Sequence, residues 1–335
     1  MQNVADYLVY LIVRLFVCAV QTLSLATCQR VARWLAWVAC DVAPLRRRVV
    51  DENLQRAFPR LSPAERTQLA RQMWEHLFLM VCEIAHAPRK IHDTNWRRYI
   101  RFPNQAPMMR LLWSERPKVF VAGHYGNFEL GGYTMGLFGF QTYAVARPLD
   151  NKYLDRFIKR FREAKGQHIL PKQGSADEIA ELLAKNRTLS VLGDQHAGPK
   201  GCWVDFFGAP ASTHKAIALF ALSNDAPLAV GYARRLDQPL EYEMGVEAIA
   251  DGGFRVQGSR HGGQAGFRVQ DADSPGRKTG FVSGASAMRE TWGLTELTQW
   301  FTTVLEGLIR RAPDQYWWVH RRWKGEPPVR VRKAA

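Results

Sequence analysis

The pattern of hydrophobic and polar residues changes near residue 117. From Lys118 onward, short apolar runs alternate with amphipathic segments, which is typical of strands and helices alternating around a mostly parallel sheet. The expected strands are 118–122, 140–145, 167–170, 188–193 and 227–233. The expected helices are 127–137, 151–164, 175–185, 213–223 and 294–311. The pattern therefore predicts an α/β fold in which helices flank a mostly parallel central sheet.

The residues before this region predict helices. Residues 8–26 form a largely apolar run interrupted by Arg14 and Gln21, close to the roughly 20 residues that span a bilayer. Arg14 near its centre would cost about 2.5–3.5 kcal/mol on insertion scales, so a spanning helix and an interfacial helix both stay open. Two amphipathic helices are expected at 46–58 and 63–87.

These patterns divide the chain into three expected parts. Residues 1–40 would carry a membrane-anchor helix, residues 41–116 a helical hairpin packed on the core, and residues 117–335 the catalytic α/β domain. Arginines follow the apolar run, and the positive-inside rule then places the residues after it in the cytoplasm. The glycine-rich segment at about 250–290 has no expected function.

The charge of the chain limits its partners. A formal net charge of +15 suits phosphates, anionic lipid headgroups, acidic carrier proteins or nucleic acid. Nucleic acid is not expected, because the arginines are scattered and no RNP-type motif, zinc-finger spacing or basic recognition helix is present. The five cysteines show no C-x-x-C pair, so neither a disulfide framework nor a metal site is indicated.

The most informative stretch is VFVAGHYGNFE, residues 119–129. His124 follows an apolar strand and precedes a helix, which places it where open α/β sheets usually bind ligands. Glu129, in the first helical turn, could accept a hydrogen bond from one imidazole nitrogen and leave the other basic. The same spacing also fits a purely structural hydrogen bond, so both interpretations stay open at this point.

The chain offers no obvious nucleophile of its own beside His124. There is no G-x-S-x-G elbow, and Cys82 and Cys202 are distant in sequence. A base without an enzyme nucleophile suggests that a hydroxyl of the acceptor attacks, and no metal or cofactor is required.

Other polar residues are candidates for substrate binding. Asp194 should emerge at a strand end on the same edge as His124, either to position the acceptor or a cation or to form a turn. Arg147 and Arg162 could bind phosphate or an oxyanion, although most surface arginines only solvate a face. In the tail, Arg321 and Arg322 alternate with aromatic residues, which suits an anionic lipid or a structural aromatic cluster.

Four separated stretches resemble the bacterial lipid A biosynthesis acyltransferases, the lauroyl and myristoyl transferases of the lysophospholipid acyltransferase superfamily. They are NLQRAFPRLSPAER (53–66), GHYGNFE (123–129), GDQHAGPKGCWVDFFGAPAST (193–213) and QYWWVHRRWK (315–324). The resemblance implies a glycerol-phosphate-acyltransferase-like fold, a catalytic pair of His124 and Glu129, a substrate-binding Asn127 within the motif, and an active-site arginine at Arg162. It further implies an acyl thioester donor on acyl carrier protein or coenzyme A and a glycolipid acceptor at the bacterial inner membrane, with the catalytic domain on the cytoplasmic side.

Three alternatives remain at this stage. The chain could acylate another membrane lipid, such as a phospholipid, a mannoside or an ornithine lipid. It could instead be a hydrolase in which His124 activates water. In the third alternative it is a non-catalytic lipid-binding scaffold, and the H-x4-E pair is structural.

Overall fold

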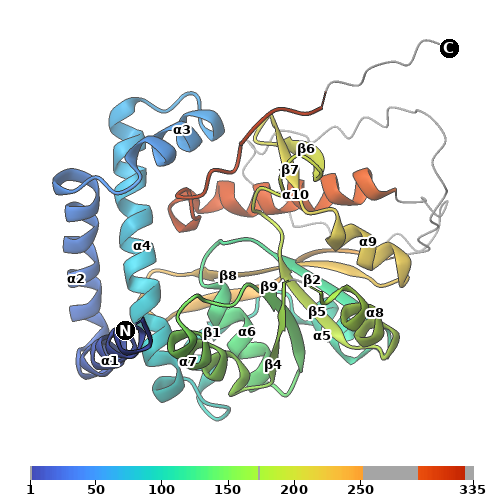
Figure 1. Ribbon diagram of the computed structural model, residues 1–335, viewed down its shortest axis with the longest axis horizontal. Coiled ribbons are helices and arrows are strands. Elements are labelled where there is room, and N and C mark those ends of the chain that lie inside the picture. Colours follow the sequence, from blue (N-terminus) through green and yellow to red (C-terminus); the bar gives the residue numbers. More distant parts are fainter. Residues whose placement is uncertain (1, 173, 252–292, 329–335) are drawn as a thin grey trace.

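The computed structural model describes residues 2–172, 174–251 and 293–328, and it shows a central sheet between two layers of helices (Figure 1). The glycine-rich segment at about 250–290 falls almost entirely outside the described residues. The fold class is the predicted one, α/β with a mostly parallel sheet flanked by helices and an N-terminal apolar helix.

The sheet has seven strands in the order β1-β9-β8-β2-β5-β3-β4. Every pairing is parallel except that of β8 with β9. The bounds are β1 Ile100–Arg101, β2 Lys118–Ala122, β3 Thr142–Ala146, β4 Gln167–Pro171, β5 Thr188–Leu192, β8 Leu228–Arg235 and β9 Tyr242–Ala250. Because β2 and β5 are parallel neighbours, the residues that follow Ala122 and Leu192 emerge side by side at one edge.

Each strand expected from the sequence is present within about two residues, but β1, β9 and a separate hairpin were not expected. The hairpin consists of β6 (Cys202–Phe206) and β7 (Ala209–Thr213), joined by Phe207 and Gly208, which both have positive φ as tight hairpins require. Ser212 and Thr213 lie in β7, so the helix expected at 213–223 begins later. That helix, α9, begins at Ala216 after Lys215.

Each face of the sheet is covered by helices. On one face lie α5 (Gln105–Trp113), α6 (Phe128–Leu137) and α7 (Lys152–Glu163), and on the other α8 (Ala176–Ala184), α9 (Ala216–Ser223) and α10 (Leu294–Arg311) (Figure 1). The second face holds the main hydrophobic core, where Val119, Val121 and Leu189 pack against Phe301 and Leu305 of α10. The face covered by α5, α6 and α7 is packed less completely and leaves a cavity between helices and sheet.

The N-terminal helices stand together beside the sheet (Figure 1). They are α1 (Gln2–Thr22), α2 (Leu25–Trp37), α3 (Arg47–Ala57) and α4 (Pro63–Lys90). The expected apolar helix thus starts earlier and ends at Thr22, because Ser24 caps a new helix by accepting the N–H of Thr27. A capping box of Ser62 and Glu65 starts α4, whose residues Leu69, Met73, Leu77 and Met80 are buried as one face.

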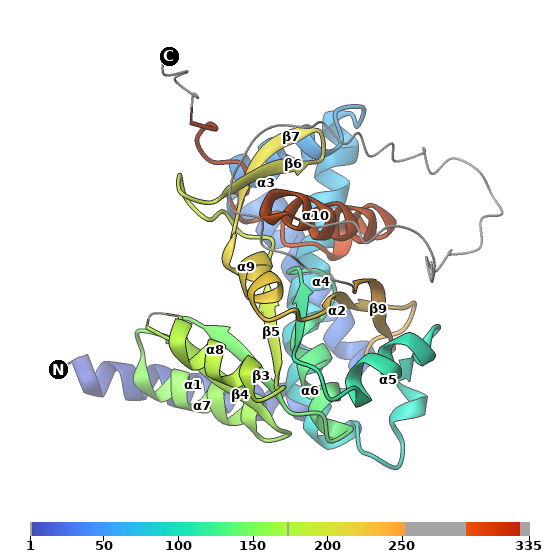
Figure 2. The same cartoon turned by 90° about the vertical axis from the view of Figure 1, so that its right-hand side faces the viewer.

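The helix α1 lies along α7 (Figure 2). Tyr7 packs edge-on against Tyr153 with ring centroids 5.2 Å apart, and Arg14 lies 5.2 Å above the ring of Phe157. Arg14 also donates to the hydroxyl of Tyr10 at 3.1 Å. Most of the other apolar side chains of α1 are exposed, and among the described residues it is the one helix long and apolar enough to cross a membrane.

Candidate active site

His124 lies in the turn between β2 and α6. The turn requires a glycine at position 126, where φ is +59° and a Cβ atom would lie 1.9 Å from the carbonyl oxygen of Ala233. Asn127 then caps α6 by accepting the N–H of Leu130. The backbone of the turn is thereby fixed against the neighbouring strand β8.

The imidazole of His124 is held by Asp194. Nδ1 of His124 donates to Oδ1 of Asp194 at 2.7 Å, and the backbone N–H of His124 donates to Oδ2 of the same carboxylate at 2.7 Å. Both side chains are buried. This arrangement fixes the tautomer in which Nε2 carries the lone pair, as a general base needs.

The surroundings of Asp194 keep it ionised. Burial alone would raise its pKa, but the imidazole of His124, its two hydrogen bonds and the guanidinium of Arg322 together lower that pKa to about 2. A carboxylate that stays charged can stabilise an imidazolium formed on its neighbour.

A second imidazole faces His124 across a shared amide. Nε2 of Gln195 lies 3.3 Å from Nε2 of His124 and 3.3 Å from Nε2 of His320. The two imidazole centroids are 5.1 Å apart. Since an amide NH₂ has two hydrogens, Gln195 can donate to both rings when their Nε2 atoms are unprotonated. Burial and then the neighbouring His124 lower the pKa of His320, which favours its neutral form.

Aromatic rings enclose the His124 imidazole. Phe128 from α6 and Trp317 from the tail each lie with ring centroids 5.0 Å from it. The tail is fixed there because the N–H of Trp317 donates to the carbonyl of His124 at 3.1 Å and Tyr316 pairs with Tyr125. These rings restrict the access of water to the imidazole.

The predicted hydrogen bond between Glu129 and His124 is not formed. Both carboxylate oxygens of Glu129 instead accept from Arg162 of α7, with Nε to Oε2 at 2.9 Å and Nη2 to Oε1. Glu129 points to α7 because it begins the helix, whereas Asp194 follows the adjacent parallel strand and meets the imidazole directly. Burial disfavours the charge on Arg162, but the hydrogen bond to Glu129 outweighs it and raises its pKa.

The other predicted binding residues take different places. Asn127 is fully buried, and besides capping α6 it donates to the hydroxyl of Tyr242 at 3.2 Å, so it faces the protein interior. Arg147 is exposed, with Asp150 3.4 Å away. Arg321 is exposed as well. Arg322 is buried and donates to the carbonyl of Ser212 and the hydroxyl of Thr213, each at 2.6 Å.

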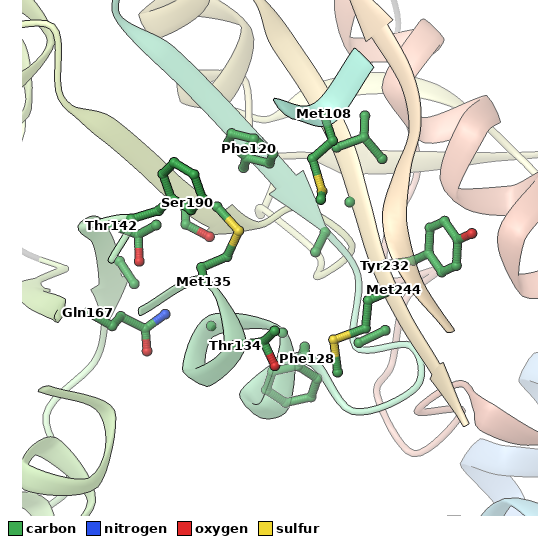
Figure 3. A pocket seen from close by; sticks show the side chains of 18 of the residues that line it. Met108, Phe120, Phe128, Thr134, Met135, Thr142, Gln167, Ser190, Tyr232 and Met244 are labelled. Atoms are coloured by element: carbon green, nitrogen blue, oxygen red, sulfur yellow. The ribbon is translucent and has the colours of Figure 1, made fainter. Parts of the chain in front are cut away.

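A cavity of about 510 Å³ lies between the sheet and the helices α5 and α6 (Figure 3). Ala122, Tyr125 and Phe128, which flank His124 in the turn, belong to its wall. Apolar side chains dominate the remainder, and Glu129 with Arg162 forms its charged part. The wall continues toward the amino ends of the strands through Phe120, Ser190, Thr142, Gln167, Met108 and Met135.

A buried polar network connects α4 to the turn that holds His124. Glu83 of α4 accepts from Nε of Arg235 and from the N–H of Leu240, at 2.8 and 2.7 Å, and from the hydroxyl of Tyr242. Arg235 also donates to Nδ1 of His76 at 2.6 Å, and Nε2 of His76 donates to the carbonyl of Gly126 at 3.2 Å. The network thus connects α4 to the catalytic turn.

Sequence reasoning did not place Gln195, His320 or Trp317 beside His124. All three lie within stretches that carried the family resemblance, but the aromatic and basic residues of the tail were expected at a lipid interface or in a structural cluster. The tail approaches His124 through backbone hydrogen bonds, for which a single sequence carries no signal. In the part of the chain that the structure describes, no group of three or more His, Cys, Asp or Glu side chains could hold a metal ion.

An imidazole held by a carboxylate beside an apolar cavity, on a mostly parallel α/β sheet, suits an enzyme that acts on an acyl group. A sequence model of the bacterial lipid A biosynthesis acyltransferases matches residues 2–252, and this chain belongs to that family. Membership supports an acyl-transfer reaction in lipid A biosynthesis, which requires an acyl donor and a glycolipid acceptor.

Two relatives are similar along most of the chain. The lipid A biosynthesis palmitoleoyltransferase of Escherichia coli (strain K12) is 25% identical over 288 residues, which cover 84% of this chain and 80% of that protein. The lipid A biosynthesis acyltransferase of Shigella flexneri has the same identity and coverage.

Proposed function

We propose that this enzyme moves a fatty acyl chain from a thioester of acyl carrier protein or coenzyme A to a hydroxyl of a lipid A precursor, with His124 as general base. The proposal rests on the His124–Asp194 pair, which follows the strand ends Ala122 and Leu192 that line the apolar cavity. The cavity would hold the acyl chain, because an apolar lining between sheet and helix suits a hydrocarbon and excludes water. The thioester carbonyl would then lie beside His124.

In the proposed mechanism, Nε2 of His124 takes the proton of the acceptor hydroxyl. The resulting alkoxide attacks the thioester carbonyl and forms a tetrahedral intermediate. Collapse breaks the carbon–sulfur bond, and the leaving thiolate takes the proton from the imidazolium. Asp194 remains ionised throughout and stabilises the imidazolium, while both hydrogen bonds to it keep the ring in place.

The oxyanion needs a hydrogen-bond donor near Nε2 of His124. The N–H groups of Gly126 and Asn127, at the start of α6, already donate to the carbonyls of Gln315 and Ala233. The amide of Gln195 is closer to the reacting atoms, since its Nε2 lies 3.3 Å from Nε2 of His124. When the acceptor hydroxyl bonds to Nε2 of His124, the N–H of Gln195 that pointed there is released and can donate to the oxyanion. We assign oxyanion stabilisation to Gln195, and Arg162 with Glu129 to the cavity wall.

The charge and the N-terminal helices support the proposed location. A net charge of +15 suits an acidic carrier protein and an anionic membrane surface, and salt should weaken such docking. The exposed apolar residues of α1 and the exposed Trp34 and Trp37 of α2 suit the membrane interface. The proposed location is the bacterial inner membrane, with the catalytic domain in the cytoplasm.

The test is acyl transfer by purified protein in detergent, from labelled acyl-carrier-protein thioester to a lipid A precursor. His124→Ala should abolish transfer while the protein keeps its fold by circular dichroism. A phospholipid and an ornithine lipid are offered in parallel as acceptors, and acyl coenzyme A as the second donor. Transfer to a phospholipid alone would overturn the lipid A acceptor, and full activity in His124→Ala would overturn the catalytic proposal.

A further inference from the structure

A group of basic residues lies near the catalytic pair and does not line the acyl cavity. His196 follows Gln195 in the loop after β5, and His214 follows β7. Three hydrogen bonds connect these segments: the N–H of Ala197 donates to the carbonyl of Ser212 at 3.2 Å, and Arg322 donates to Ser212 and to Thr213. The loop, the hairpin and the tail therefore meet at one place.

Two lysines extend this group. Lys172, at the end of β4, is among the charges that act most strongly on His214, and Lys324 acts in the same way on His196. Burial and these cations lower the pKa of both imidazoles. The first turn of α9 adds its partial positive charge next to His214, since Lys215 gives it no side-chain cap.

Among the described residues, few carboxylates lie close enough to offset this positive charge. Asp194 is the carboxylate that acts on His214, and it is already bound to His124. Within the residues that the structure describes, neither Lys172 nor Lys324 forms an ion pair. Two polar atoms here are buried without a partner among those residues: Nδ1 of His196 and Nε of Arg322, a side chain that is 2% exposed.

We infer that Lys172, His196, His214 and Lys324, backed by the buried Arg322, form a binding site for a phosphate ester of the substrate. Unpaired cations, uncapped helix N–H groups and imidazole donors together suit a phosphate, which accepts several hydrogen bonds at once. The site adjoins Gln195, so its ligand belongs to a molecule engaged at His124. This inference rests on the proposed function and deepens it.

The phosphate could belong to either substrate. A phosphorylated glycolipid acceptor carries a phosphate monoester, and the pantetheine arm of the donor carries a phosphodiester. Both have the same recognition chemistry, so the experiment separates them by removing one phosphate at a time.

The test compares Lys172→Gln, His214→Gln and the double variant with wild type. Lys185→Gln is the matched control, because it removes one exposed lysine that pairs with Glu181 at the end of α8. In one arm the acceptor is supplied with and without its phosphate, and in the other the donor is acyl-phosphopantetheine or acyl-pantetheine, which differ only in the phosphate. A third arm measures the rise in melting temperature that inorganic phosphate produces.

We expect the double variant to lose at least about 10-fold of the preference for the phosphorylated form in one arm, since a charge-assisted hydrogen bond contributes about that much. The arm in which the loss occurs identifies the substrate that carries the phosphate. Lys185→Gln should keep both preferences. Unchanged preferences in the double variant, or equal stabilisation of all proteins by phosphate, would overturn the site.

The third arm also separates this inference from the proposed function. If wild type transfers no acyl chain but phosphate stabilises it more than the double variant, the site stands and the transfer reaction fails. If wild type transfers acyl chains and the double variant retains every phosphate effect, the transfer stands and the site fails.

Discussion

Asp194 accepts two hydrogen bonds from His124, one from Nδ1 of the ring and one from the backbone N–H, although the residues are 70 positions apart in sequence. The contact forms because β2 and β5 are parallel neighbours that end at the same edge. One carboxylate therefore sets both the position of the turn and the orientation of the imidazole within it.

Asp194→Asn should therefore impair the chemical step. The amide would keep the shape of the side chain but would lack the charge that fixes the tautomer and stabilises the imidazolium, so we expect kcat to fall by about 10³–10⁴, as in comparable His–Asp pairs. Steady-state kinetics with saturating donor and acceptor measure this loss.

Glu129→Gln is the matched carboxylate control. Its oxygens bind Arg162 and not His124, so we expect a far smaller fall in kcat than for Asp194→Asn. The reverse order of effects would contradict the assignment of Asp194 as the positioning residue of His124.

Asp194 also makes the free energy of unfolding depend on pH. The pKa of Asp194 is lowered from 3.8 to about 2 in the folded protein. The stabilisation that ionised Asp194 gives to the folded protein is present in full above pH 3.8, the pKa of the unfolded chain, and is lost as the pH falls toward about 2. We expect wild type to lose about 2 kcal/mol more than Asp194→Asn between pH 5 and pH 2. Urea unfolding in detergent at each pH measures the difference, and parallel losses in the two proteins would disprove it.

Filling the cavity should shorten the preferred acyl chain. Ser190 lies in the wall beyond His124, toward the amino ends of the strands (Figure 3). Ser190→Phe should shift kcat/KM toward shorter thioesters by at least about 10-fold, because a methylene that does not fit costs about 1–3 kcal/mol. Competition between thioesters of different length measures the shift. Ser190→Ala removes the hydroxyl without filling space and should keep the wild-type preference, and an unchanged preference in Ser190→Phe would place the acyl chain elsewhere.

The buried network should matter for stability. Glu83→Gln leaves the buried guanidinium of Arg235 without its counter-charge and should lower the free energy of unfolding by about 3–5 kcal/mol. Urea unfolding of the purified protein in detergent measures this change.

The adjacent pair of Arg234 and Glu243 provides the control, because its side chains are about a quarter exposed. Glu243→Gln should cost about 1 kcal/mol or less. Equal losses in the two variants would show that burial of Glu83 does not decide the effect.

The sequence pattern predicted β2, β3, β4, β5 and β8 to within about two residues, because each contains a short apolar run. It missed β9, which pairs antiparallel with β8 and alternates buried with half-buried residues at its start instead of forming a continuous apolar run, and it missed the hairpin of β6 and β7. The apolar run at 8–26 spans the end of one helix and the start of the next, since Ser24 caps α2.

At the candidate site, the sequence predicted the strand-to-helix turn at His124 and a hydrogen bond between Glu129 and its imidazole, but in the structure Asp194 accepts that hydrogen bond. Spacing within one segment favours Glu129, while the actual partner comes from another strand, which only the sheet order reveals. The same reason applies to His320, because its place depends on the tail folding back over the turn. Asn127 and Arg322 were expected to bind substrate, and the hydrogen bonds that each forms in the structure go to other groups of the protein, which spacing along the chain does not reveal.

The tail that closes the site has a consequence for how the enzyme is made. The turn at His124 is synthesised nearly two hundred residues before Trp317, His320 and Arg322, whose rings and guanidinium complete its surroundings. A nascent chain can form the sheet while the tail residues from 315 onward are still inside the ribosome. The reactive imidazole is therefore finished late in translation, and a product that terminates before residue 315 would have a sheet and a cavity but no enclosed base.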